Sequence, residues 1–149
     1  MTIEDSFNFR RIDDRLTTSG ILSIEQLEHL GREGYDCVIN LLPDDSEYAV
    51  PSERDVIEGQ GIDYVHIPVD FAAPTHADFA AFATAMDAHA GAKVHVHCAA
   101  NYRVSAFYAV YARRQGLCTD AEADELVRGL WNPDEHSAWH EFLISTPDA

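Results

Sequence analysis

The alternation of short apolar runs with helix-like segments is the feature that most constrains the fold of this chain. The run 37–42 is nearly continuous in apolar residues, which is typical of a strand buried on both faces. Residues 15–18, 63–67 and 93–97 also have strand character, and a segment with helical signals follows each run. This alternation predicts an α/β fold, in which helices flank a central, mainly parallel sheet of four to five strands.

Polar residues that commonly cap helices mark where the helices begin. The expected N-caps are Ser23, Ser52, Thr75 and Thr119. A further helix is predicted from about residue 103 to residue 114, after a loop that starts at Cys98. Beyond Pro133, the large side chain of Trp139 is expected to pack on the core together with Phe142.

The charge and the cysteine count narrow the class of protein. The chain has 149 residues and a formal net charge of −16, and such a surface repels nucleic acids and anionic membrane faces. We therefore expect neither a nucleic acid nor a membrane as a partner. The cysteine count of three is odd and residues 1–15 lack a signal-peptide pattern, which favours reduced thiols and a cytoplasmic location. The oligomeric state stays open.

The segment 94–105 is the part of the sequence that indicates chemistry. A strand leads into Cys98, and a tight loop then leads into a helix. Amide groups at a helix start are unpaired and attract an anion, and they equally favour a thiolate at Cys98. The planar guanidinium of Arg103 can hold two phosphate oxygens, and Asn101 tolerates a left-handed backbone. An anion-binding loop is therefore predicted; the alternative is a buried structural cysteine followed by a surface arginine.

A proton donor for phosphate ester cleavage is predicted at Asp70. This residue follows the strand 63–67, so it lies on the same sheet edge as Cys98 if the strands are parallel. The leaving oxygen of an ester needs a proton, which a carboxylic acid can supply. The loop 69–74 around it can also move as a lid. The alternative is that Asp70 is a solvated acidic residue in a turn.

Three polar residues near Cys98 have their own interpretations. His97 is expected to orient or electrostatically support the thiolate, whereas His95 is expected to be a core histidine with satisfied hydrogen bonds. Ser105 either hydrogen-bonds the thiolate or helps the thiol to leave in a second step, or it is an ordinary residue of the first helical turn. A zinc site is not expected, because the two histidines share one strand face, Cys98 belongs to the next loop, and no further cysteine pair has ligand spacing.

The pair His97 and Cys98, followed by a short loop and Arg103, resembles the dual-specificity branch of the protein tyrosine phosphatase superfamily. An acidic residue upstream, here Asp70, is part of the same resemblance. The chain is more similar still to a bacterial phosphatase-like family known as DUF442, through its early segment 9–20 and its His-Cys-Ala loop. The resemblance covers most of the chain.

This resemblance implies a single phosphatase-like domain over residues 1–149. The domain would hydrolyse a phosphomonoester through a thiol-phosphate intermediate on Cys98, with Asp70 acting as acid and then as base. The implied phosphate-binding residues are Ala99, Ala100, Asn101, Tyr102 and Arg103. No metal or organic cofactor is implied, and the substrate would be a phosphorylated protein or a small-molecule phosphomonoester.

The loop departs from the usual phosphatase pattern in its length. Four residues separate Cys98 from Arg103 where five are usual, a central glycine is absent, and Val104 follows the arginine. Single-domain rhodaneses have a cysteine loop of similar length, in which the cysteine carries a persulfide. A rhodanese-like sulfurtransferase is therefore the second hypothesis, and a phosphate-binding module without catalytic activity is the third.

Overall fold

The computed structural model describes residues 2–145, which form a central sheet of five strands. The strands are β1 (Arg10–Arg11), β2 (Leu16–Ser19), β3 (Cys37–Asn40), β4 (Asp63–His66) and β5 (Val94–His97). Their order in the sheet is β1-β2-β5-β3-β4; β1 is antiparallel to β2, and the other neighbours are parallel. The carboxyl ends of β2, β3, β4 and β5 therefore meet at one edge, which is where such sheets bind ligands.

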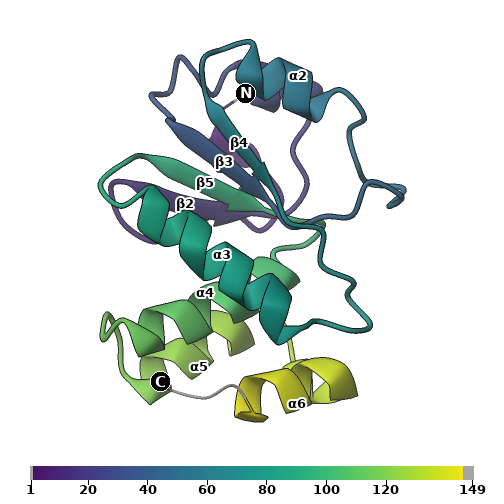
Figure 1. Cartoon of the computed structure of the whole chain (residues 1–149), viewed down its shortest axis with the longest axis vertical. Helices are drawn as coiled ribbons and strands as arrows, with labels where there is room; N and C mark the ends of the chain where they lie inside the picture. The colour runs from purple at the N-terminus through teal and green to yellow at the C-terminus, as the bar shows by residue number, and fades with distance from the viewer. Residues whose placement is uncertain (1, 146–149) are drawn as a thin grey trace.

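Helices cover both faces of the sheet (Figure 1). The elements on one face are η1 (Ile3–Asp5), α1 (Ile24–Glu28) and α2 (Glu53–Glu58). The elements on the other face are α3 (His76–Ala88), α4 (Tyr102–Arg114), α5 (Asp120–Arg128), η2 (Pro133–Glu135) and α6 (Ser137–Ser145). Among the helices within residues 2–145, none is both long enough and apolar enough to span a bilayer.

Each face of the sheet has its own hydrophobic core, because successive side chains of a strand point to opposite faces. Val38 of β3 belongs to the core shared with Leu27 of α1 and Ile57 of α2. The next residue, Ile39, belongs to the other core, which includes Phe107 of α4. That second core also holds the C-terminal aromatic residues, since Trp139 and Phe142 are buried there as the sequence predicts.

The predicted α/β fold is confirmed, and the predicted strand bounds are shifted by only one or two residues. The sequence does not predict β1, because a strand of two residues has no periodicity to detect. Ser23, Thr75 and Thr119 accept the expected capping bonds. The expectation for Ser52 is wrong: it stands at the N-cap of α2 with φ −92° and ψ 7°, not in the extended conformation that aims a cap, and its side chain makes no capping bond.

Candidate active site

Cys98 lies at the junction between β5 and α4, at the carboxyl edge of the sheet. Asn101 is the N-cap of α4 and has the left-handed backbone predicted for it, with φ 66° and ψ 13°, but its side chain makes no capping bond. Ser105 N donates the first α-helical bond to Asn101 O at 3.0 Å, so the amides of residues 102–104 precede that bond. These amides and the helix dipole favour an anion beside the loop.

The N-terminal segment holds the loop after Cys98 in place. Asn8 Nδ2 donates to Ala100 O at 2.9 Å, and Asn101 Nδ2 donates back to Asn8 O at 2.9 Å. Gly20, at the end of β2, allows the loop to come close, because a Cβ atom there would lie 2.5 Å from Ala99 O. No local sequence signal marks Asn8 or Gly20 for this role, since it depends on a contact between segments far apart in the chain.

Arg103 extends from the first turn of α4 toward the loop that follows β4. Its Nε donates to Val69 O at 2.8 Å, and its guanidinium carbon lies 5.2 Å from the centre of the Phe71 ring. Within residues 2–145, Arg103 forms no ion pair with a carboxylate. Its terminal nitrogens are therefore available to donate hydrogen bonds to two oxygens of a phosphate group.

Asp70 and Arg103 line the same cleft at the carboxyl edge of the sheet. The remaining lining residues are Pro43, Asp45, Ser46, Phe71 and Ala72. Asp70 is exposed, and its Oδ1 accepts a hydrogen bond from Ala72 N at 2.9 Å. Cys98 has no exposed surface and does not line this cleft. The structure thus brings Asp70 and Arg103 together in one cleft. The thiol of Cys98 is buried at the start of the loop that leads to Arg103.

His97 has its partner on the opposite face of the sheet from α4. Its Nε2 lies 2.6 Å from Oε2 of Glu53 in α2, and both side chains are at most 5% exposed. Its Nδ1 has no hydrogen-bond partner among the described residues. His97 therefore joins β5 to α2 immediately before Cys98. No local sequence signal marks Glu53, because a glutamate in the first turn of a short helix has no distinctive pattern.

His95 is a core histidine with both ring nitrogens bonded, as the sequence predicts. Nδ1 lies 2.7 Å from Thr17 Oγ1, which is 2.7 Å from Tyr35 OH, and Nε2 lies 2.8 Å from Ser19 Oγ. Since Ser19 Oγ donates to Gly20 O, it accepts from His95, which places the ring proton on Nε2. Burial lowers the pKa of His95 well below its usual value, so the ring is neutral.

The hydroxyl of Ser105 bonds elsewhere, and burial disfavours the thiolate form of the other two cysteines. Ser105 Oγ donates to Tyr102 O at 3.0 Å and accepts from Trp131 Nε1 at 3.0 Å, and it makes no hydrogen bond to Cys98. Burial raises the pKa of Cys37 to about 12, which suits an unreactive core thiol. Burial also raises the pKa of Cys118.

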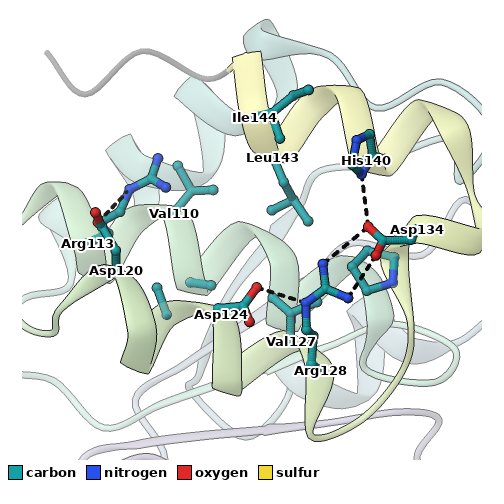
Figure 2. A pocket seen from close by; sticks show the side chains of 13 residues that line it. Val110, Arg113, Asp120, Asp124, Val127, Arg128, Asp134, His140, Leu143 and Ile144 are labelled. Carbon is teal, nitrogen blue, oxygen red and sulfur yellow. Dashed lines mark hydrogen bonds and ion pairs between the residues drawn. The ribbon is translucent and has the colours of Figure 1, made fainter.

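A second cavity lies between α4, α5 and α6 and shares no residue with the cleft (Figure 2). Arg128 pairs with Asp124 at 2.9 Å and with Asp134 at 3.1 Å, and His140 lies 2.9 Å from Asp134. Arg128, and then His140, lower the pKa of Asp134. This cavity is bordered by charges that neutralise one another. In the described part of the chain, no group of three or more histidine, cysteine, aspartate or glutamate residues could hold a metal ion.

The fold is that of the phosphatases of the protein tyrosine phosphatase superfamily. P. aeruginosa TpbA superposes with a TM-score of 0.75 over 95% of this chain and 86% of its own, at 17% sequence identity. The same protein has also been solved in complex with phosphotyrosine. At this identity the likeness concerns the fold alone.

Within that class, the chain belongs to the family described as the phosphatase-like domain of beta-lactamase hydrolase-like protein, whose model matches residues 8–114. The beta-lactamase hydrolase-like protein of Agrobacterium fabrum is 35% identical over 101 residues, which are 66% of this chain but only 23% of that relative. A crystal structure of a candidate DUF442 phosphatase from Shewanella putrefaciens CN-32 has a TM-score of 0.87 and 36% identity, and covers 96% of this chain and 90% of its own. The family resemblance seen in the sequence is thereby confirmed.

Proposed function

We propose that this protein is a cysteine-dependent phosphatase that hydrolyses phosphomonoesters. The observation that carries the proposal is that Arg103 and Asp70 line one cleft beside the loop that begins at Cys98. The start of α4 has no side-chain cap, and Arg103 forms no ion pair within residues 2–145, so both can bind an oxyanion. Membership in a phosphatase-like family agrees with this assignment.

The proposed reaction has two displacement steps at phosphorus. The thiolate of Cys98 attacks, an S–P bond forms, and the bond to the ester oxygen breaks while Asp70 gives that oxygen its proton. The carboxylate of Asp70 then takes a proton from water, which attacks phosphorus and breaks the S–P bond. Inorganic phosphate leaves and the thiolate is restored. In both steps Arg103 and the amides of residues 99–103 hold the non-reacting oxygens.

His97 and Ser105 support this loop without touching the reacting atoms. His97 ties the end of β5 to Glu53 of α2 through its 2.6 Å contact. Ser105 ties the first turn of α4 to Trp131 through its hydroxyl. These contacts restrict the conformations of the loop before a substrate binds, which reduces the entropy lost on binding.

The substrate is proposed to be a phosphorylated protein or a small-molecule phosphomonoester. Asp45 and Asp70 in the cleft, together with the net charge of −16, disfavour highly anionic substrates. Phosphotyrosine bound to P. aeruginosa TpbA makes aryl phosphates the first substrates to test.

Paired assays of the purified protein test the proposal. One measures phosphate release from an aryl phosphate, and the other measures thiocyanate formed from thiosulfate and cyanide. Cys98→Ser is expected to reduce phosphate release to the uncatalysed background, since a hydroxyl at this position is a much poorer nucleophile. Cys118→Ser is the matched control that removes a different thiol and keeps activity.

Each alternative outcome of these assays has a definite meaning. Thiocyanate formation that depends on Cys98, without phosphate release, would overturn the phosphatase and support a sulfurtransferase. Phosphate release that persists in Cys98→Ser would overturn the thiol-phosphate mechanism. If both activities are absent but vanadate binds, the protein is a phosphate-binding module.

A further inference from the structure

The loop 69–74, which carries Asp70 and is called the acid loop below, is anchored by helix α6. The indole Nε1 of Trp139 donates a hydrogen bond to Phe71 O at 2.7 Å. Trp139 has no exposed surface, so its indole N–H depends on this bond, and leaving a buried donor without a partner is costly.

The two carbonyl groups that flank Asp70 are held from opposite sides. Val69 O accepts from Arg103 Nε at 2.8 Å, and Phe71 O accepts from Trp139 Nε1 at 2.7 Å. One anchor belongs to the phosphate-binding loop, and the other belongs to the C-terminal helix. The backbone position of Asp70 relative to Arg103 is therefore set by both anchors together.

The ring of Phe71 strengthens this attachment. It packs against an aromatic cluster whose members are Tyr102, Trp131, His136 and Trp139, at centroid distances from 5.0 Å to 6.4 Å. The guanidinium of Arg103 also contacts this ring, 5.2 Å from its centre. A displacement of the acid loop would break these contacts, so the described conformation is a tethered one and not that of a free lid.

We infer that Trp139 is a positioning residue for the proton transfer by Asp70. The inference rests on the proposed function and adds a part of the chain to it, since Trp139 lies beyond residues 8–114 that the family model matches. Trp139 acts through Phe71, and it touches neither the substrate nor the reacting atoms. The C-terminal helix is thus part of the site, although its sequence contains no group that reacts.

The test compares Trp139→Phe with Phe142→Leu, one turn further along the same buried face of α6. Phe142 packs on Phe79 and Phe107 and lies edge-on to Trp139, so its replacement weakens the docking of α6 but keeps the indole Nε1 that donates to Phe71 O. A displaced acid slows poor leaving groups more than good ones. We expect Trp139→Phe to lower kcat/KM for phenyl phosphate about tenfold, as the loss of one buried hydrogen bond would, and to affect p-nitrophenyl phosphate much less.

A second measurement does not depend on activity. Hydrogen exchange at the amides of Ala72 and Ala73, which donate to Asp70 Oδ1 and Asp70 O, is expected to accelerate in Trp139→Phe but not in Phe142→Leu. Thermal unfolding establishes that both variants are folded.

The outcomes separate this inference from the proposed function. Equal losses for both leaving groups in Trp139→Phe, or unchanged amide exchange, would overturn the positioning role. If the wild-type protein shows no hydrolysis that depends on Cys98, the proposed function fails, and the exchange experiment alone still decides whether Trp139 holds the acid loop.

Discussion

His95 lies within strand β5, and the Cys98 loop follows the end of the same strand. The polar groups of the two regions differ in how fully they are hydrogen-bonded. Around His95, both ring nitrogens are bonded within the core, and the ring is neutral. Three residues further on, at Cys98, the chain starts a loop whose helix has no side-chain cap and whose Arg103 forms no ion pair within residues 2–145. Asn101 Oδ1 in this loop also lacks a partner among the described residues. The fully bonded groups around His95 keep the strand rigid. The polar groups of the Cys98 loop that lack partners can form hydrogen bonds with a ligand.

The position of the two regions on the strand explains the difference. His95 faces the α1–α2 side in the middle of the sheet, where Thr17 and Ser19 of the neighbouring strand are within hydrogen-bonding reach. The Cys98 loop lies past the end of β5, and β2 pairs only part of it: Cys98 N donates to Ser19 O, and Asn101 Nδ2 donates to Thr18 Oγ1. Asn101 Oδ1 is left without a partner among the described residues. The same strand can thus hold the site firmly and still present unpaired groups at its end.

The largest effect is expected from replacing Arg103, which forms no ion pair within residues 2–145. Arg103→Lys removes the fork that holds two oxygens as well as the Nε bond to Val69, so we expect vanadate affinity to fall by about 1,000-fold. Arg128→Lys is the matched control, because Arg128 already pairs with Asp124 and Asp134. Inhibition constants for vanadate measure both. Equal affinity in the wild type and Arg103→Lys would show that the loop amides alone bind the anion.

The next largest effect concerns Asp70, the proposed acid beside the Cys98 loop. Asp70→Asn cannot donate a proton, so kcat/KM for phenyl phosphate is expected to fall about 100-fold or more, with a smaller loss for p-nitrophenyl phosphate. Asp45→Asn, on the same cleft, is expected to keep the wild-type ratio between the two substrates. A uniform loss in Asp70→Asn would remove the acid role and leave Asp70 as an electrostatic contributor.

The smallest effect is expected around His95, and it concerns the free energy of unfolding. The pKa of His95 is lowered by burial, so below about pH 6.5 the unfolded chain takes up a proton that the folded ring rejects. Stability is therefore fully present above that pH and is lost on acidification, with a contribution of up to about 1.4 kcal/mol per pH unit from this ring.

His95→Gln tests this contribution, because glutamine does not titrate. The variant is expected to be less stable at neutral pH, since it disrupts the bonds to Thr17 and Ser19, but its stability should depend less steeply on pH between 6.5 and 5. Denaturant unfolding at several pH values measures the slope. A slope identical to that of the wild type would mean that folding does not shift the pKa of His95.

Much of the fold is predictable because its signals are local. The apolar run at β3, the caps Ser23 and Thr119, and the left-handed Asn101 each depend on a few neighbouring residues. Ser52 shows the limit of such signals, since its residue type suits a cap but its backbone lies outside the capping conformation. The approximate location of the site is predictable for a similar reason, since a parallel sheet directs the strand ends to one edge.

The sequence by itself determined the alternation of strands and helices, the placing of Cys98 between a strand and a helix, and the presence of Arg103 and Asp70 after two strand ends. Only the tertiary structure decided which distant groups hold these residues: Glu53 on His97, Asn8 on the loop, and Trp139 on the acid loop. The physical reason is the distance along the chain over which each kind of signal acts. Periodicity and capping are encoded within a few residues, whereas a hydrogen bond across the core depends on how separate elements pack, and no short pattern records it.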